Sequence, residues 1–482
     1  MQNKCYITTP IYYPNAEPHL GSAYTTIVAD FLARFYRDVG YKTFFLTGLD
    51  EHGEKIEKTA KDKGIEPKAF VDEMAALFKK AWERLGIEYD YFIRTTDEKH
   101  KKGVQAFLEK VMENGDIYLG TYEGYYCVGC ERYYTEKELL EGLLCPLHLK
   151  KVEEKRIESY FFRLSKYKEM LLDFYDKNKN FIPDYYIDQI KNNLKELKDL
   201  SISRPKSQVS WGIELPFDKE HVAYVWFDAL LNYYTACPKD MWPPDMQIIG
   251  KDILWFHAVI WPAMLMAVKE KLPSRILAHG FLTVDGRKMS KSLGNVINPI
   301  EMAEKYGNDA LRYYLITKIA FGVDGDFSIN AFKYAYNNEL IGHYGNLANR
   351  LAALSNSIGY EKALYHDNEK IKEAIEVLHN SARLYNAESI IKCYTDKIWP
   401  IISDINAFLN KEEPWKKKNN SKNVIGQCLN AFFNVSVLLR PLLPNATSNI
   451  LNNNIKIRDI REDISMQWNP VKKQYVVYKK VD

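Results

Sequence analysis

The chain has 482 residues, of which 46% are hydrophobic and 27% are charged, so we expect two to four domains with a large core. No apolar run approaches the roughly 20 residues of a membrane-spanning helix, and the first ten residues lack the layout of a signal peptide, which favours a soluble, cytoplasmic protein. The net charge of +3 neither requires nor excludes a nucleic-acid partner, and seven cysteines are too few for a disulfide scaffold.

The first fifty residues predict a strand, a helix and a second strand. Residues 5–9 are β-branched and aromatic, and residues 10–18 form a loop that contains three prolines. From Ser22 onward apolar side chains recur at helical spacing, namely Tyr24, Ile27, Val28, Phe31, Leu32 and Phe35. A second apolar strand at 43–47 leads into three polar residues, Asp50, Glu51 and His52, which we expect to reach a cleft. This order is typical of a Rossmann-like, doubly wound α/β domain, which binds nucleotides at its strand ends.

Further along the chain, residues 118–217 interrupt the α/β pattern with cysteine pairs and short strand-like pieces, and we interpret them as an inserted domain. The α/β pattern resumes at 222–226 and 247–250. From about residue 331 a helical period dominates up to about residue 452, which predicts an α-helical bundle. Its first apolar stripe consists of Leu340, Tyr344, Leu347, Leu351 and Leu354. The predicted parts are 1–117 and 218–275 for the α/β domain, 118–217 for the insert, 276–330 for a connecting region and 331–482 for the bundle. The last 25 or so residues have mixed character and receive no assignment.

The insert contains two closely spaced pairs of potential metal ligands. Cys127 and Cys130 enclose two residues, and after a spacer of fourteen residues Cys145 and His148 enclose two more. This spacing predicts a tetrahedral Cys3His zinc site. The alternative is four buried residues that sit in pairs by chance. A closed set of four ligands leaves no open position for water, so we expect one structural Zn²⁺ rather than a catalytic one.

A short polar segment lies in the connecting region, where residues 288–292 read Lys-Met-Ser-Lys-Ser among glycines. Lys288 and Lys291 are flexible point charges, and Ser290 and Ser292 are hydrogen-bond donors, a combination suited to a polyphosphate. The alternative is an ordinary solvated surface loop.

Near the N-terminus, His19 and Gly21 lie at the expected start of the first helix. Free backbone N–H groups and the helix dipole favour an anion there. Gly21 lets a base or a phosphate approach the backbone, and His19 offers a donor to a phosphate oxygen. The alternative is that His19 only caps the helix. Ser22, which follows, can donate to a phosphate or act as a cap.

Together the two segments resemble the paired signatures of class I aminoacyl-tRNA synthetases, His-Ile-Gly-His and Lys-Met-Ser-Lys-Ser. Within that class the chain is similar to the methionyl family over essentially its whole length. The matching segments are 12–19, 46–53, 199–204, 224–229 and 249–253, with His257, Trp261 and the zinc knuckle. The resemblance implies that methionine is activated with ATP and Mg²⁺ to methionyl-adenylate and then transferred to the 3′ end of tRNA(Met), initiator and elongator. It also implies that residues 276–330 carry a loop and stem-contact region.

The resemblance further implies roles for individual residues. ATP would be bound by His19, Gly21, Ser22, Lys288, Ser290, Lys291 and Ser292, with the loop closing over it. The side chain of methionine, which favours aromatic neighbours, would be lined by Ile11, Tyr13, Trp226, Ala229, Leu230, Tyr233, Ile253, His257 and Trp261. Asp50 would hold the α-ammonium group. Taken singly, each pocket residue is more often a core residue than a binding residue.

One position departs from the family pattern, because Ser22 stands where the signature has histidine. Serine carries no positive charge. We therefore expect Lys288 and Lys291 to supply most of the charge near the phosphates, and we expect the chain to be active.

Residues of the predicted bundle suggest an RNA partner. Asn346 and Arg350 are four residues apart and share a helix face, and Trp415 is followed by three lysines. Such groups hydrogen-bond to and stack on unpaired bases. The family positions that they match contact the CAU anticodon, with Trp415 stacking on a base, so the resemblance implies that residues 331–482 bind the anticodon. The alternative for the lysine run is a solvated helix end.

Two other functions are compatible with parts of the sequence. Leucyl, isoleucyl and valyl enzymes need a large editing domain, for which an insert of 100 residues is too small, and a cysteinyl enzyme would place its zinc at the amino-acid site. A catalytically silent RNA-binding or regulatory relative is favoured only by Ser22. Because the chain ends soon after the bundle, we expect a monomer without an appended dimerising domain.

Overall fold

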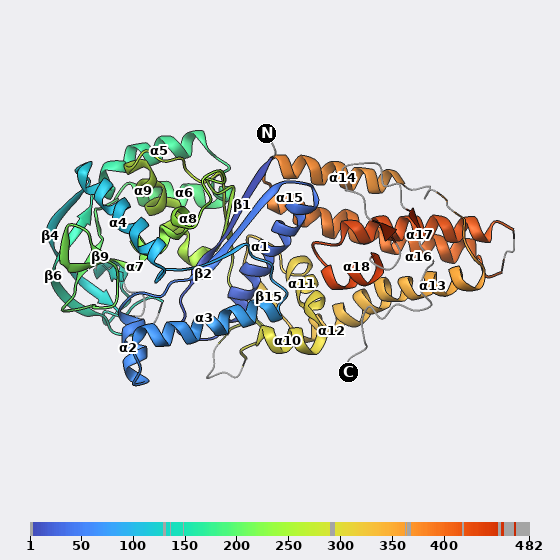
Figure 1. Ribbon diagram of the computed structural model, residues 1–482, viewed down its shortest axis with the longest axis horizontal. Helices are drawn as coiled ribbons and strands as arrows, with labels where there is room; N and C mark the ends of the chain where they lie inside the picture. Colours follow the sequence, from blue (N-terminus) through green and yellow to red (C-terminus); the bar gives the residue numbers. More distant parts are fainter. Residues whose placement is uncertain are drawn as a thin grey trace.

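The computed structural model describes residues 3–128, 132–134, 136–147, 149–289, 295–361, 363, 368–416, 419–451, 455–456 and 467–468. Figure 1 shows an elongated molecule, with the β-rich part at one end and long helices at the other. Helix α1 (Leu20–Asp38) lies between the two. No helix within the described ranges is long and apolar enough to cross a membrane.

A five-stranded parallel sheet forms the centre of the β-rich part, in the order β12-β11-β1-β2-β3. Its strands are β1 (Lys4–Tyr12), β2 (Lys42–Leu49), β3 (Tyr91–Arg94), β11 (Met246–Gly250) and β12 (Ile276–His279). The chain builds β1, β2 and β3 outward in one direction and later adds β11 and β12 on the other side of β1. The strand order therefore reverses between β1 and β11, and a crevice is expected at the carboxyl ends of these two strands.

Helices cover both faces of this sheet. Successive residues of β1 point to opposite sides, because Ile7 belongs to one apolar cluster and Tyr6 to another. The Ile7 cluster includes residues of α1, α2 (Glu54–Asp62) and α3 (Pro67–Arg84). The Tyr6 cluster includes residues of α4 (Glu98–Glu113), α7 (Val225–Leu230), α8 (Asn232–Thr235), a π-helical turn (Phe256–Ile260) and α9 (Trp261–Ala267). The predicted parallel sheet with helices on both faces is confirmed.

The predicted insert, together with the residues 218–223 that follow it, forms two small antiparallel sheets. The first has the order β5-β4-β6-β7, built from β4 (Ile117–Cys127), β5 (Arg132–Tyr134), β6 (Glu153–Phe162) and β7 (Leu200–Ser201). The second has the order β8-β10-β9, built from β8 (Ser203–Pro205), β9 (Glu214–Leu215) and β10 (Asp218–Ala223). Helices α5 (Lys168–Lys177) and α6 (Asp184–Leu194) and the 3₁₀ turns Glu136–Glu138 and Leu164–Tyr167 complete the insert. The insert shares a core with the main domain, since Phe162 and Ile249 lie in the same cluster.

One sequence-based expectation about this region is wrong. Residues 222–226 were predicted to resume the α/β pattern, but β10 pairs antiparallel with β8 and β9 and α7 starts at Val225. The parallel sheet resumes only at β11. The apolar run at 222–226 is buried on both sides of the strand-to-helix junction, so its hydrophobicity alone does not distinguish the two sheets.

Beyond β12 the chain forms a three-stranded sheet with the order β14-β13-β15. Its strands are β13 (Leu282–Val284), β14 (Arg287–Lys288) and β15 (Gly325–Phe327), and α10 (Pro299–Tyr306) and α11 (Asn308–Thr317) lie between the last two. Asp285 and Gly286 connect β13 to β14 with φ values of 48° and 73°. An Asp-Gly pair with two positive φ angles is typical of a tight hairpin turn.

Helices make up the far end of the molecule, as predicted (Figure 1). They are α12 (Ile329–Tyr334), a π-helical segment (Ala335–Gly345), α13 (Asn346–Ser357), α14 (Asn368–Arg383), α15 (Ala387–Cys393), a π-helical turn (Tyr394–Ile398), α16 (Trp399–Glu412), α17 (Ser421–Leu438) and α18 (Pro444–Leu451). Two short strands follow, β16 (Ile455–Lys456) and β17 (Gln467–Trp468). The predicted stripe is confirmed, because Leu340, Tyr344, Leu347 and Leu351 are buried and Leu354 packs against them.

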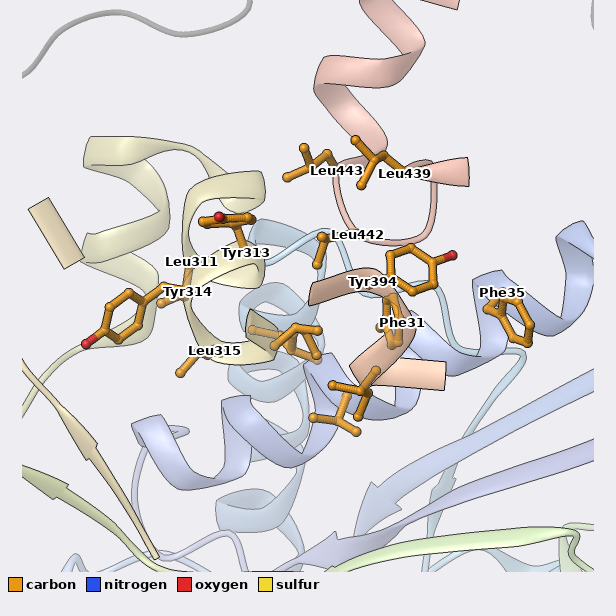
Figure 2. Packing of buried hydrophobic residues seen from close by; sticks show 14 of the residues in the cluster. Phe31, Phe35, Leu311, Tyr313, Tyr314, Leu315, Tyr394, Leu439, Leu442 and Leu443 are labelled. Atoms are coloured by element: carbon orange, nitrogen blue, oxygen red, sulfur yellow. The ribbon is translucent and has the colours of Figure 1, made fainter. Parts of the chain in front are cut away.

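Helix α1 also contacts the bundle. Figure 2 shows Phe31 and Phe35 of α1 close to Tyr394 and to the leucines that follow α17. The rings of Phe31 and Tyr394 meet edge to face at 4.9 Å. The same helix therefore has its N-terminus near the carboxyl end of β1 and its C-terminal half against the bundle.

A buried ion pair reinforces this contact. The carboxylate of Asp30, on α1, lies 2.6 Å from Nη1 of Arg312 on α11 and 2.7 Å from Nε of Arg34. Arg312 also donates to the carbonyl of Pro441, after α17, at 2.9 Å. Burial by itself would raise the pKa of Asp30, but the two guanidinium groups hold it below its ordinary value.

Candidate active site

His19 caps α1 through one nitrogen of its imidazole ring. Nδ1 accepts hydrogen bonds from the backbone N–H of Gly21 at 3.0 Å and of Ser22 at 3.3 Å. A nitrogen that accepts cannot carry a proton, so the proton of the neutral ring lies on Nε2. Partial desolvation lowers the pKa of His19, which favours this neutral form. The ring therefore serves both as a cap and as an N–H donor directed away from the helix.

Ser22 is turned toward the backbone of the same turn. Its hydroxyl donates to the carbonyl of His19 at 2.8 Å, and the residue is buried. Neither of the two roles foreseen from the sequence, phosphate donor or helix cap, describes this contact, because the cap is His19 itself.

Two residues at the neighbouring strand ends were missed by the sequence interpretation. His279, the last residue of β12, is buried between the ring of Tyr24 at 5.0 Å and the hydroxyl of Thr25 at 2.7 Å from its Nε2. Burial lowers its pKa, and its Nδ1 is 2.8 Å from the carbonyl of Gly280. Asp252 follows β11 and raises the pKa of both His19 and His279 by its charge, against the effect of burial. The sequence contained one signal that could have identified them, a titratable residue at or just after the carboxyl end of each of two apolar strands.

The turn after β2 is held by hydrogen bonds on several sides. The N–H of Asp50 donates to the carbonyl of Tyr12 at the end of β1, at 2.9 Å. The carbonyl of Glu51 accepts from the indole N–H of Trp211 at 2.6 Å, and the N–H of Glu51 donates to the hydroxyl of Thr95 at 2.9 Å. Asp50 is thereby fixed beside the end of β1, next to Tyr13.

The expectation that all three polar residues of this turn reach a cleft is wrong. Glu51 is fully buried, and its carboxylate is bound by Arg94 at 2.6 Å and by the hydroxyl of Thr96. Burial raises the pKa of Glu51, although Arg94 and Thr96 oppose the shift. His52 is 3% exposed and also points inward, so only Asp50 is partly exposed.

His52 belongs to a buried chain of hydrogen bonds. Its Nδ1 lies 2.7 Å from Oδ2 of Asp228 on α7, and Nε2 of His100 on α4 lies 2.7 Å from Oδ1 of the same carboxylate. Nδ1 of His100 lies 2.7 Å from the hydroxyl of Thr235 on α8. Burial would raise the pKa of Asp228, but the two imidazoles hold it below its ordinary value. The carboxylate is therefore ionised and both ring nitrogens that face it are donors.

Most of the residues predicted to line the methionine pocket lie in the Tyr6 cluster or pack against it. Leu230, Tyr233 and Trp261 are buried in the Tyr6 cluster, and Ile11, Tyr13, Trp226 and Ile253 pack against it. Ala229 is buried on α7. His257 is buried too, with Nε2 2.8 Å from the hydroxyl of Tyr233 and Nδ1 3.0 Å from the carbonyl of Ile253. Burial lowers the pKa of His257 to about 4, so the ring is neutral and accepts from Tyr233.

A further aromatic residue of this cluster was missed. Phe256 stacks on Trp226 with ring centroids 3.7 Å apart and an angle of 8° between the planes. It opens the π-helical turn that also carries His257. π-Helical turns occur often at functional sites, but no feature of the sequence distinguished Phe256 from its apolar neighbours.

The polar loop lies only partly within the described residues. The backbone of Lys288 pairs with Thr283 in the β13–β14 hairpin, and Met289 packs against the core. Ser290, Lys291 and Ser292 lie outside the described residues.

Half of the predicted zinc ligands can be located. Cys127, at the end of β4, and Cys145 are 5% and 0% exposed and share a small cluster with Tyr134 and Val152. Sγ of Cys145 is 3.7 Å from the hydroxyl of Tyr134. Cys130 and His148 lie outside the described residues, and no group of three or more metal-ligating side chains occurs among the residues that are described.

The residues predicted to bind the anticodon lie on the bundle. Asn346 and Arg350 are on α13, and Asn346 is exposed. The guanidinium of Arg350 lies over the ring of Trp415, 4.8 Å from its centroid, and Trp415 is 42% exposed. Arg350 and Trp415, which are 65 positions apart in the sequence, thus form one surface feature. Lys417 and Lys418 lie outside the described residues.

Known proteins match the chain over most of its length. The profile of the family described as "tRNA synthetases class I (M)" matches residues 5–156 and 140–352. A protein of Thermotoga maritima named methionine–tRNA ligase is 44% identical over 477 residues, which are 93% of this chain and 74% of that protein. One of the same name from Thermosynechococcus vestitus is 42% identical over 92% of this chain and 88% of its own.

Solved structures agree with the sequence matches. The methionyl-tRNA synthetase of Mycobacterium tuberculosis bound by methionyl-adenylate superposes with a TM-score of 0.91 at 33% identity, over 99% of this chain and 100% of that chain. The free form of the same enzyme superposes with a TM-score of 0.85 at 30% identity, over 100% and 99%. The parallel sheet, the capped helix that follows its first strand and these matches agree, and the chain belongs to the methionyl family of class I tRNA synthetases.

Proposed function

We propose that this chain is a methionine–tRNA ligase, which joins methionine to ATP as methionyl-adenylate and transfers the methionyl group to tRNA(Met). Relatives named methionine–tRNA ligase and a structure with methionyl-adenylate bound support this function. The observation that supports it most within the molecule is positional. His19 follows β1, the turn with Asp50 follows β2, and the pocket residues Ile253, His257 and Trp261 follow β11, beside the point where the strand order reverses.

In the first step the carboxylate of methionine attacks the α-phosphorus of ATP, and pyrophosphate leaves. Negative charge grows on the phosphate oxygens in the transition state, so fixed donors near them lower the barrier. The Nε2–H of His19 is one such donor, held in place because Nδ1 is engaged by the helix. We assign the positive charges to Lys288 and Lys291, with Ser290 and Ser292 as further donors and Gly21 as the site of close approach.

Asp50 is the proposed partner of the α-ammonium group of methionine. Its backbone is tied to Tyr12, so the carboxylate stands beside Tyr13 and the end of β1. The side chain of methionine would enter the cluster of Ile11, Trp226, Ala229, Leu230, Tyr233, Ile253, His257 and Trp261. A neutral His257 that accepts from Tyr233 leaves no charge in this pocket, which suits a thioether.

We further propose one structural Zn²⁺ in the insert, bound by Cys127, Cys130, Cys145 and His148. Burial of Cys127 and Cys145 in one small cluster, apart from the two large cores, fits a metal that stands in for a hydrophobic core. Zn²⁺ bound there would hold the knuckle together and would take no part in the reaction.

For the RNA substrate, we assign anticodon recognition to Asn346, Arg350 and Trp415. An exposed tryptophan with a guanidinium stacked on one face offers its other face to an unpaired base, and Arg350 adds a charge for the backbone. Initiator and elongator tRNA(Met) carry the same CAU triplet, so both would be substrates.

The remaining proposals concern organisation. We propose the parts 1–117, 118–217, 218–275, 276–330 and 331–482, a monomeric state, Mg²⁺ as the partner of ATP and a cytoplasmic location.

The decisive test is methionine-dependent exchange of pyrophosphate into ATP by the purified, zinc-supplemented chain, followed by aminoacylation of tRNA(Met). We expect exchange with methionine and none with leucine, isoleucine, valine or cysteine. An RNA-binding relative without activity would bind tRNA(Met) and show no exchange, and that result would refute the proposed function.

A further inference from the structure

We infer that the buried chain His52–Asp228–His100 positions the two halves of the methionine site relative to each other, an inference that rests on the proposed function. One half is the turn that carries Asp50, and the other is α7, which carries Trp226, Ala229 and Leu230. His52, Asp228 and His100 act through these residues and are positioning residues, not groups that touch the substrate.

The link between the two halves follows from where the partners lie. His52 is two residues from Asp50, and Asp228 lies on α7 between Trp226 and Ala229. Residues of a helix advance about 100° per position, so Trp226, Ala229 and Leu230 share one side while Asp228 lies on the opposite side from Trp226. Asp228 is 1% exposed and Trp226 is partly exposed, in agreement with this arrangement.

Helix α7 depends on such an anchor because it is short. It has six residues and no side-chain hydrogen bond at its N-cap. Helices of this length have little stability of their own, so tertiary contacts determine their orientation. The contact between His52 and Asp228 spans 176 positions of sequence and is charge-assisted, which makes it stronger and more directional than a contact between apolar side chains.

His100 completes the anchor from a third element. The carboxylate of Asp228 is fully buried, and a buried charge is stable only when its oxygens are hydrogen-bonded. His52 serves Oδ2 and His100 serves Oδ1, both at 2.7 Å. Gly103 permits the close approach of α4 to α8, because a Cβ there would lie 2.5 Å from Cγ2 of Thr235. The same close packing brings His100 to both Asp228 and Thr235.

Variants of His100 can keep or remove the hydrogen-bond donor to Asp228 while the size of the side chain stays similar. The amide nitrogen of glutamine takes a place similar to Nε2 of histidine, so His100→Gln keeps a donor to Asp228, whereas His100→Leu removes it at similar size. We expect His100→Leu to raise the KM for methionine in pyrophosphate exchange about tenfold, which equals about 1.4 kcal/mol. The KM for ATP should stay within about twofold, and His100→Gln should restore most of the affinity for methionine. His343→Leu, at an exposed histidine of the bundle, is the control and should change neither constant.

Three results would overturn the inference. They are an equal rise in both KM values for His100→Leu, a loss in kcat with an unchanged KM for methionine, and a His100→Gln variant as impaired as His100→Leu. If His100→Leu does not fold, His100→Asn replaces it, because its shorter amide does not reach Asp228 from the same backbone.

Calorimetric titration with methionine separates this inference from the proposed function. A wild-type chain that binds methionine but shows no exchange refutes the function alone, and the Kd values of the variants then decide the positioning role. A wild-type chain that does not bind methionine overturns both.

Discussion

Replacing Asp30 by asparagine should destabilise the chain through a buried charge rather than through a lost contact. The side chains of Asp30 and Arg312 are 0% and 1% exposed, and the asparagine would leave Arg312 positive with no carboxylate at 2.6 Å. Breaking one side of a buried ion pair typically costs about 3–5 kcal/mol. For a cooperative unit of 150–250 residues, this corresponds to a fall in melting temperature of ~6–20 °C.

The decisive measurement is a double-mutant cycle followed by thermal unfolding. Arg312→Met alone should also be costly. Asp30→Asn combined with Arg312→Met should regain much of the loss, because the charges of Asp30 and Arg312 are both gone and Arg34 keeps its pair with Glu88. Asp173→Asn, at the exposed pair with Lys177, is the matched control and should produce no measurable shift. Strictly additive losses in the cycle would refute the reasoning.

The same pair predicts a pH dependence. The arginines hold the folded-state pKa of Asp30 below its ordinary value, although burial opposes them. The contribution of the ionised Asp30 to folding stability is therefore fully present above the unfolded pKa of about 3.9 and is lost as the pH falls through the folded pKa. The Asp30→Asn variant should lack this part of the acid sensitivity.

Three further predictions concern other parts of the molecule. Trp415→Ala and Arg350→Ala should each raise the KM for tRNA(Met) about tenfold and leave pyrophosphate exchange unchanged, since stacking of one base contributes ~1–3 kcal/mol to binding. Equal aminoacylation by variant and wild type would contradict the anticodon assignment. Gly48→Ala should lower the free energy of unfolding by at least ~2 kcal/mol, because the new Cβ would lie 2.0 Å from the carbonyl oxygen of Ile93 and push β2 away from β3. An unchanged melting temperature would show that the strands are spaced differently. Burial lowers the pKa of His257 to about 4. The contribution of the neutral His257 ring to folding stability is therefore fully present above the unfolded pKa of about 6.5 and is lost as the pH falls toward 4. An imidazole titration by nuclear magnetic resonance with a midpoint near 6.5 would contradict this.

Much of the fold was predictable because it depends on local pattern. The spacing of Tyr24, Ile27, Phe31 and Phe35 predicted the helix α1, and the structure buries all four, together with most of the rest of that helix. The stripe from Leu340 to Leu351 predicted the bundle for the same reason. The segment at 222–226 was assigned to the wrong sheet, because hydrophobicity shows that a strand is buried but not which strands it pairs with.

The site was predictable only in part, because its connections span long distances in sequence. Resemblance to the family selected Asp50, His257 and Trp226, and the structure brings seven of the nine pocket residues into or against one apolar cluster, namely Ile11, Tyr13, Trp226, Leu230, Tyr233, Ile253 and Trp261. It gave no indication that His52 turns inward to Asp228, a partner 176 positions away. A polar residue after a strand can face the crevice or the interior, and only the three-dimensional neighbours decide which.

The double use of the His19 ring affects how experiments on it are interpreted. One nitrogen holds the first turn of α1 and the other remains available as a donor, so His19→Ala removes both at once. Its kinetic loss would combine a weakened helix start with a missing ligand contact. His19→Asn keeps a side chain that caps helices well while giving up the imidazole N–H. The difference between these two variants, rather than either alone, measures what the ring contributes to the reaction.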